Sequence, residues 1–190
     1  MPSVRKLDLL ERSYQYVLLH GLVDLSLRPL AAAIGSSPRV LLFLFGSKDG
    51  LTRALLDRAR ADELALLERL RPAGTQHPPG LEVVAVQVWS WLSMPEHRAL
   101  LTLWVEGYAR SLADAEGVWA DFARATVEDW MAVLAAAQPP AERVSTAGRA
   151  RRTLVLAVLR GALLDLLATE DIERTTAAVR QHVETPPQRR

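Results

Sequence analysis

The sequence contains no cysteine in its 190 residues. A disulfide framework and a thiolate zinc site are therefore excluded. It also lacks a long apolar run, because the most apolar stretch, Leu154–Ala168, is interrupted by Arg160 and Asp165. A membrane-spanning helix needs about 18 to 20 apolar residues in succession. We therefore expect no membrane-spanning segment.

Residues that could carry catalysis are also sparse. The four histidines are scattered along the chain at His20, His77, His97 and His182. The sequence has no HExxH or GxSxG motif and no glycine-rich phosphate loop. Glu128 and Asp129 are adjacent on an expected helix, so their carboxylates point in different directions. We expect no enzymatic activity, no cofactor and no metal site.

A strong excess of charge is missing as well. The formal net charge is +1, which does not by itself indicate nucleic-acid binding. The distribution is uneven, however: residues 1–60 contain nine Lys or Arg and five Asp or Glu, a net charge of +4, and the remainder carries −3. A basic N-terminal part on an acidic body favours DNA at the N-terminal end.

The composition that remains is that of a globular protein, with 49% hydrophobic and 24% charged residues, and it can form a substantial core. The length fits one large helical domain, or a small domain joined to a medium one. Arg5, Lys6 and Asp8 interrupt any apolar segment of a secretory signal near the N-terminus. A cytoplasmic location is therefore the expectation.

The most informative stretch runs from Leu25 to Leu51. Ser26 is a favourable N-cap, and Gly35 stands where a left-handed residue would end a helix of about two turns. Ser37 and Pro38 then begin a second short helix, since proline is favourable at the first helical position. These signals predict two short helices joined by a tight turn.

Gly46 ends the second short helix, and Ser47 caps a third helix over Lys48–Leu70. Spacing alone leaves two interpretations of this pattern. One is an ordinary helical hairpin, and the other is a helix-turn-helix that inserts its second helix into the DNA major groove.

A resemblance bears on this choice. Ten residues match the N-terminal signature of the tetracycline-repressor (TetR) family: Gly21, Ser26, Leu30, Ala31, Gly35, Ser37, Leu41, Phe45, Lys48 and Leu51. The resemblance covers roughly the first 55 residues, including the helix expected over Val4–Leu19. It implies an all-helical, dimeric, ligand-responsive DNA-binding regulator.

The sequence also departs from the family pattern. Leu42 and Leu44 stand where the family usually has a tyrosine and a polar aromatic residue, which help to hold the phosphate backbone. Pro29 and Gly50 stand where acidic residues are common, so neither capping box can close. The second short helix is therefore unusually apolar, with Arg39 as its only charged residue.

The rest of the chain predicts further helices over Leu81–Met94, Pro95–Leu112, Val118–Ala137, Ala141–Thr169 and Asp171–Val183. The breaker-rich segment Arg71–Gly80 is the expected domain boundary. The fold class is therefore all-α, with about nine helices. We expect a DNA-binding head over residues 1–50, continuing into a connecting helix over 48–70, and a ligand-binding and dimerisation bundle over 71–190.

Aromatic residues are concentrated in the expected bundle. Their role is either to fill a solid core or to line a cavity for a mainly apolar ligand. The expected ligand-binding residues are Trp89, His97, Leu101, Trp104, Tyr108, Trp119, Phe122, Thr126 and Trp130.

The functional expectation is a transcriptional regulator, a repressor with three partners. These partners are a palindromic double-stranded DNA operator, a second copy of the chain and a small apolar ligand that releases the DNA. The expected DNA-binding residues are Arg28, Ser37, Pro38, Arg39, Val40, Leu42, Phe43 and Lys48. The homodimer would close through Arg152–Ala168 and Asp171–Val183. The alternative is a helical ligand-binding or protein-interaction module that no longer reads DNA, supported by the apolar Leu42 and Leu44.

Overall fold

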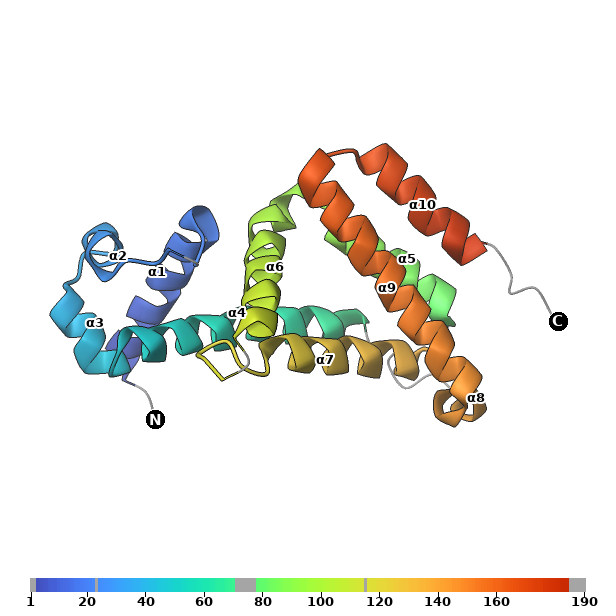
Figure 1. Ribbon diagram of the computed structural model, residues 1–190, viewed down its shortest axis with the longest axis horizontal. Coiled ribbons are helices and arrows are strands. Elements are labelled where there is room, and N and C mark those ends of the chain that lie inside the picture. Colours follow the sequence, from blue (N-terminus) through green and yellow to red (C-terminus); the bar gives the residue numbers. More distant parts are fainter. Residues whose placement is uncertain (1–2, 23, 71–77, 115, 185–190) are drawn as a thin grey trace. The chain divides into compact units, whose positions relative to one another are not determined.

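The computed structural model describes residues 3–22, 24–70, 78–114 and 116–184. In these residues the chain forms ten α-helices, one short 3-10 helix and no strand (Figure 1), which confirms the all-α fold class. The helices are α1 (Val4–His20), α2 (Leu27–Ala33), α3 (Pro38–Phe45), α4 (Lys48–Leu70), α5 (Leu81–Leu92), α6 (Arg98–Ala113), α7 (Phe122–Ala136), α8 (Pro140–Val144), α9 (Thr146–Thr169) and α10 (Ile172–Glu184); the 3-10 helix is Pro95–His97.

Three predicted helices differ from those in the structure by more than two residues. The helix expected from Pro95 begins as a 3-10 turn before α6. The helix expected from Val118 begins only at Phe122, because turn hydrogen bonds and the left-handed Asp121 (φ 65°) occupy residues 117–121. The helix expected over Ala141–Thr169 is divided into α8 and α9, because Ser145 is extended and its side chain caps α9 by accepting a hydrogen bond from Gly148 N.

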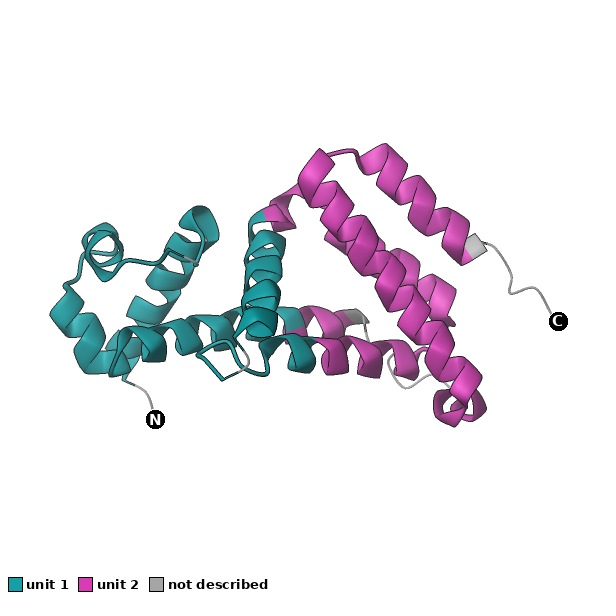
Figure 2. Cartoon of the chain, in the orientation of Figure 1, with its two compact units in different colours: residues 1–63, 99–126 teal, residues 64–98, 127–190 magenta. Residues whose placement is uncertain are grey.

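The described chain forms two compact units (Figure 2). Unit 1 contains residues 1–63 and 99–126, and unit 2 contains residues 64–98 and 127–190. These units do not coincide with a division at Arg71–Gly80, because α6 and the start of α7 belong to the same unit as the N-terminal helices. Residues 71–77 of that segment lie outside the described residues. The functional division at residues 50 and 71 stays a prediction.

In unit 1 a polar network ties α1 to α4. The Tyr14 hydroxyl, on a side chain that is only 1% exposed, donates to Asp62 Oδ2 at 2.8 Å. Arg58 pairs with Asp62 and, at 2.8 Å, with Glu11, and its guanidinium lies 4.6 Å from the centre of the Tyr14 ring. Burial and the hydrogen bond to Asp62 both raise the pKa of Tyr14, so its hydroxyl stays protonated as a donor.

In unit 2 the helices α5, α9 and α10 pack together. Val88, Leu159 and Val179 contribute to the buried core, and Trp89 Nε1 donates to Thr176 Oγ1 at 2.9 Å. The buried side chain of Gln138 lies at the junction of α8 with α9. It donates a hydrogen bond to the Gly148 carbonyl at 3.0 Å and accepts one from Arg152 at 2.9 Å. Trp89 and Gln138 therefore have hydrogen-bond partners inside the unit rather than being exposed for a ligand.

Within the described residues no single helix is long and apolar enough to span a membrane, and α2 and α3 reach that length and apolarity only as a pair bent by 102°.

The α1–α4 network predicts a pH-dependent contribution to stability. Burial acts to raise the pKa of Glu11, but hydrogen bonds from Arg58 and Gln15 outweigh it and lower the pKa below the ordinary 4.5. The stabilisation is therefore present above pH 4.5 and is lost as the pH falls through the lowered folded value. Glu11→Gln should lower the melting temperature at pH 7 by about 2 to 4 °C, since an exposed pair contributes at most about 1 kcal/mol.

The difference between Glu11→Gln and the wild type should disappear below the lowered pKa, as measured by thermal melting from pH 7 to pH 3. Glu96→Gln is a matched control, because Glu96 has no ion pair within the described residues. A Glu11→Gln deficit that stays constant across this range would contradict the assignment.

Candidate nucleic-acid interface

The interface is built on the joint between α2 and α3. Their axes are bent by 102°, within the range of about 90 to 120° typical of a helix-turn-helix. The chain leaves α2 through Gly35, whose φ of +67° suits glycine, and Ser36 N donates to the Ala31 carbonyl at 2.8 Å. Ser37 then caps α3 by accepting a hydrogen bond from Val40 N, as the sequence predicts.

The joint between α3 and α4 is also tightly built. Ser47 Oγ accepts a hydrogen bond from Gly50 N at 2.9 Å. A Cβ atom at residue 50 would lie 2.1 Å from the Phe45 carbonyl oxygen, which is too close for any side chain. The glycine that departs from the family pattern at this position therefore allows α4 to begin directly against the end of α3.

Packing decides which face of α3 is exposed for contact with another molecule. Leu41 and Phe45 are buried, with 1% and 8% of their surfaces exposed. At about 100° per residue, Phe43 projects from the opposite side of the helix, and it is 85% exposed. Arg39, one turn earlier, is exposed on the same side.

The other expected DNA-binding residues surround this face. Arg28 on α2, Lys48 at the start of α4 and Leu42 are exposed, and Ser37, Pro38 and Val40 are half-buried. The structure therefore brings the expected set onto α2, α3 and the two adjoining turns. Contact with DNA by these residues stays a prediction.

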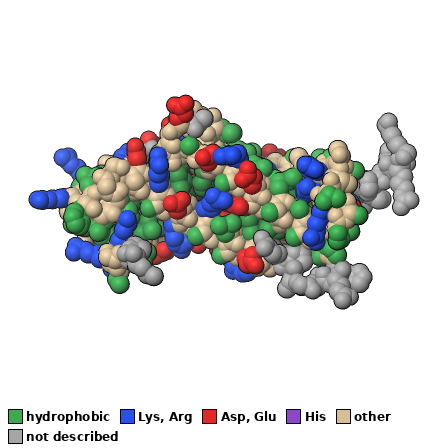
Figure 3. Space-filling view, turned by 90° about the horizontal axis from the view of Figure 1, so that it is seen from below, with side chains coloured by type: hydrophobic (Ala, Val, Ile, Leu, Met, Phe, Trp, Pro, Cys, Tyr) green, Lys and Arg blue, Asp and Glu red, His purple; other side chains and the backbone are tan. Residues whose placement is uncertain are grey.

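The charged side chains of α2, α3 and the turn between them are all basic. Between Ser26 and Ser47 the only charged residues are Arg28 and Arg39. Figure 3 shows basic side chains projecting from the α2–α3 part of unit 1, with apolar surface between them. This combination complements a polyanion whose grooves carry apolar as well as polar groups.

A contact that the sequence does not indicate joins α6 to the turn after α1. Glu106 Oε2 accepts a hydrogen bond from the backbone N–H of Leu22 at 3.1 Å. Its carboxylate also lies close to Gly21, so that a Cβ added there would be 3.2 Å from Oε1. Glu106 lies 84 residues after Leu22, and no local pattern could have revealed this pairing.

The nine expected ligand-binding residues are divided between the units. Trp89, His97 and Trp130 belong to unit 2, and Leu101, Trp104, Tyr108, Trp119, Phe122 and Thr126 belong to unit 1. His97 is occupied within unit 2, where its ring stacks on Trp91 at 3.8 Å and its Nδ1 lies 2.8 Å from the Trp91 carbonyl oxygen.

The unit 1 members lie around α6 and the start of α7. Trp104, Trp119 and Phe122 are 7%, 9% and 8% exposed. Thr126 Oγ1 donates to Oε2 of Glu63 at 3.4 Å, and Glu63 is fully buried. A buried carboxylate needs polar partners, and Thr126 is one of them. This buried carboxylate was not predicted from the sequence.

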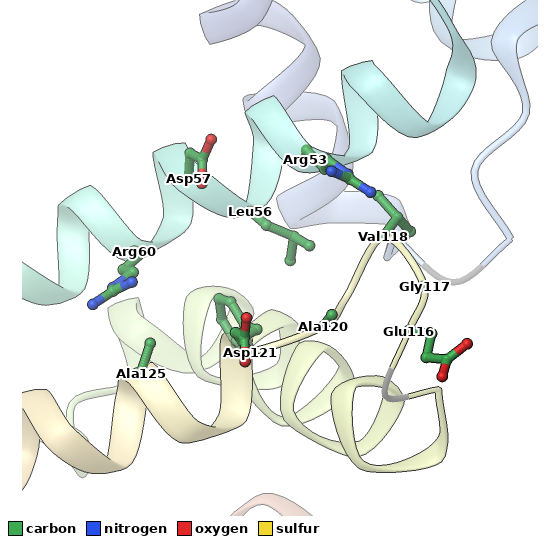
Figure 4. Close-up of a pocket in the computed structure, with 11 residues that line it drawn as sticks. Arg53, Leu56, Asp57, Arg60, Glu116, Gly117, Val118, Ala120, Asp121 and Ala125 are labelled. Carbon is green, nitrogen blue, oxygen red and sulfur yellow. The ribbon is translucent and has the colours of Figure 1, made fainter.

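A cleft of about 330 Å³ lies in unit 1 between α4 and the segment that leads into α7, and Phe122, one of the expected ligand-binding residues, is part of its lining (Figure 4). Leu56 and Ala120 face each other across it, whereas the Glu116 carboxylate points away. Arg53, Arg60, Asp57 and Asp121 give it a mixed charge, which differs from the apolar lining expected for the ligand. In the described residues no group of three or more His, Asp or Glu side chains could hold a metal ion.

Solved structures of other proteins share the fold of this chain. No family model matches the sequence, and no curated protein matches it. Among solved structures, a TetR transcription regulator from Haloarcula marismortui ATCC 43049 superposes with a TM-score of 0.72 at 18% identity, covering 95% of both chains. A putative TetR-family transcriptional regulator from Rhodococcus sp. superposes with a TM-score of 0.71 at 20% identity, again covering 95% of both chains.

The multidrug binding protein EbrR, complexed with proflavin, has a TM-score of 0.65 at 23% identity, covering 94% of this chain and 99% of EbrR. These similarities extend over almost the whole chain, whereas the sequence signature covers only its first part. They confirm, at the level of the fold, the resemblance expected from the N-terminal residues. The chain has the fold of the TetR-family transcriptional regulators.

Proposed function

We propose that the protein is a homodimeric transcriptional repressor that binds a palindromic DNA operator and is released from it by a small ligand. The observation that carries this proposal is the α2–α3 joint, which presents Arg39 and Phe43 on one exposed face of a helix held at 102° to its neighbour. The named regulators among the structural neighbours support the same function.

In this proposal α3 enters the major groove. The Arg39 guanidinium contacts a base edge, because it can donate two hydrogen bonds to guanine O6 and N7. Arg28 and Lys48 are exposed on either side and contact phosphates, which positions α3 without reading the sequence. Ser37, Pro38, Val40 and Leu42 form the remaining contact surface around these residues.

The proposed dimer closes through α9 and α10. Five small or apolar residues of α9 are exposed at alternating spacings of three and four: Leu154, Ala157, Gly161, Leu164 and Ala168. This spacing places them in one stripe along the helix. Apart from Gly161, its chain neighbours and the nearby backbone of α9, no heavy atom lies within 4 Å of the position that a Gly161 Cβ would take, so a second helix could approach closely there.

The proposed ligand is a mainly apolar aromatic molecule that contacts the unit 1 residues around α6. Leu101, Trp104, Tyr108, Trp119 and Phe122 supply apolar surface, and Thr126 with Glu63 supplies polar groups. EbrR is described in complexes with proflavin and with imidazole, both of them ring compounds. Because α6 also carries Glu106, a ligand that displaces α6 would act directly on the Leu22 turn.

Substitution of the two cations should separate base reading from phosphate binding. Arg39→Ala should cost about 1 to 3 kcal/mol on the preferred operator and relax its sequence preference, because a base contact is lost. Lys48→Ala should weaken binding to all sequences alike and reduce the slope of log K against log salt by about one. The measurement is fluorescence anisotropy on an operator selected from random DNA, at several salt concentrations.

Arg124→Ala is the control for that experiment, because Arg124 is an exposed arginine of unit 1 that pairs with Asp121 on the α7 side. Wild-type affinity and specificity in both Arg39→Ala and Lys48→Ala would contradict the interface. Failure to enrich any sequence would favour a protein-interaction module instead.

The dimer predicts that a charge on the α9 stripe separates the subunits. Leu164 is 52% exposed, so Leu164→Arg leaves the core of unit 2 intact but buries a guanidinium in the proposed interface. Sedimentation velocity at micromolar concentration should show a dimer for the wild type and a monomer for the variant. Leu112→Arg, at a residue that is 69% exposed on α6, should remain a dimer; a monomeric wild type would refute the proposal.

Ligand binding should be visible in tryptophan fluorescence. With proflavin as the probe, we expect quenching of the emission and a higher melting temperature, since a ligand that binds only the folded state stabilises it. Trp104→Phe should lose most of the quenching, whereas Trp91→Phe should retain it, because Trp91 stacks on His97 in unit 2. A chain that responds neither to proflavin nor to a broad panel of aromatic compounds has only a solid core there.

A further inference from the structure

We infer that Phe43 reads thymine, through contact of its exposed ring with the C5-methyl group of that base in the major groove, one turn of α3 beyond the base that Arg39 contacts. This inference rests on the proposed DNA-binding function and specifies the operator that it requires. Among the bases, thymine is the one whose major-groove edge carries a methyl group.

The position of Phe43 follows from the packing of α3. Leu41 and Phe45 are buried on the inner side, and Phe43 lies between them in sequence, so its ring projects outward. Arg39 precedes it by four residues, which places both side chains on the same face. An approach that brings the Arg39 guanidinium to a base edge therefore brings the Phe43 ring to the groove as well.

The surroundings of Phe43 indicate which partner covers its ring. The 22 residues from Ser26 to Ser47 contain two cations and no acid, and Lys48 follows as a further exposed cation. A groove flanked by two rows of phosphates matches this pattern, since Arg28 and Lys48 meet the backbone on either side while Arg39 and the Phe43 ring meet the base edges between them. Both Arg28 and Arg39 would repel a basic partner.

The spacing of the two side chains predicts the spacing of the two bases. Four residues of helix rise about 6 Å, which corresponds to about two base pairs at 3.4 Å each. Each half of the operator should therefore contain a guanine and, about two base pairs away, a thymine. Operator selection from random DNA with the full-length chain tests this spacing directly.

The decisive experiment replaces each thymine of the selected operator, one pair of symmetric positions at a time, by deoxyuridine. This change removes the methyl group and keeps every hydrogen-bonding group of the base. At one pair of positions the wild type should lose affinity, by about fourfold for each methyl group removed and so by about 15-fold for the two half-sites together. This is the loss expected when about one buried methyl group is removed from each half-site.

Variants then assign this loss to Phe43. Phe43→Ala should bind the thymine and deoxyuridine operators equally, and its melting temperature should equal that of the wild type because the side chain is exposed. Leu19→Ala removes an 81% exposed apolar side chain from α1 and should retain the full difference between thymine and deoxyuridine. Affinities are measured by fluorescence anisotropy at one fixed salt concentration.

The failure of this inference differs from the failure of the proposed function. If an operator is selected and deoxyuridine is tolerated at every position, or if Phe43→Ala keeps the discrimination, the thymine contact is overturned while DNA binding stands. If no sequence is enriched, the DNA-binding function is overturned, and the thymine contact with it.

Discussion

The burial of one face of α3 is the constraint on which the candidate interface depends. An eight-residue helix has only about two turns, so two inward side chains fix the direction of all the others. Leu41 and Phe45 supply that pair, and Leu30 of α2 is buried completely on the facing helix. Arg39 and Phe43 are exposed as a direct consequence, because the residues that anchor α3 leave no other orientation for them.

The remainder of unit 1 holds this arrangement in place through polar contacts over long sequence separations. Arg58 and Tyr14 connect α4 to α1, and Glu106 connects α6 to the backbone after α1. The Glu106 contact ties α6 to the turn that follows α1. Two sets of contacts therefore reach α1 and the turn after it, one from α4 and one from α6 through Leu22.

In the proposed function, dimerisation compensates for the small number of polar groups on α3. One head offers a single guanidinium and one exposed ring for base contacts, and most specific protein–DNA affinities require more. A two-fold dimer repeats the same contacts on a second half-site and fixes the distance between them. The stripe of exposed small and apolar residues on α9 is therefore as important to the proposed function as Arg39 itself.

The amino-acid sequence by itself determined the local structure of the N-terminal part: α4 has its predicted bounds, and Ser37, Pro38 and Gly35 begin and end helices where capping preferences and backbone sterics require. It could not determine the break at Ser145, the late start of α7 or the buried Glu63. Glu63 is buried against Thr126, a partner 63 residues away in the chain, and the other two features follow from a local cap and local turns that helical periodicity does not describe. Tertiary structure alone also decided that Phe43 faces outward and that Glu106 reaches Leu22, because periodicity specifies which residues share a face but not which face becomes buried.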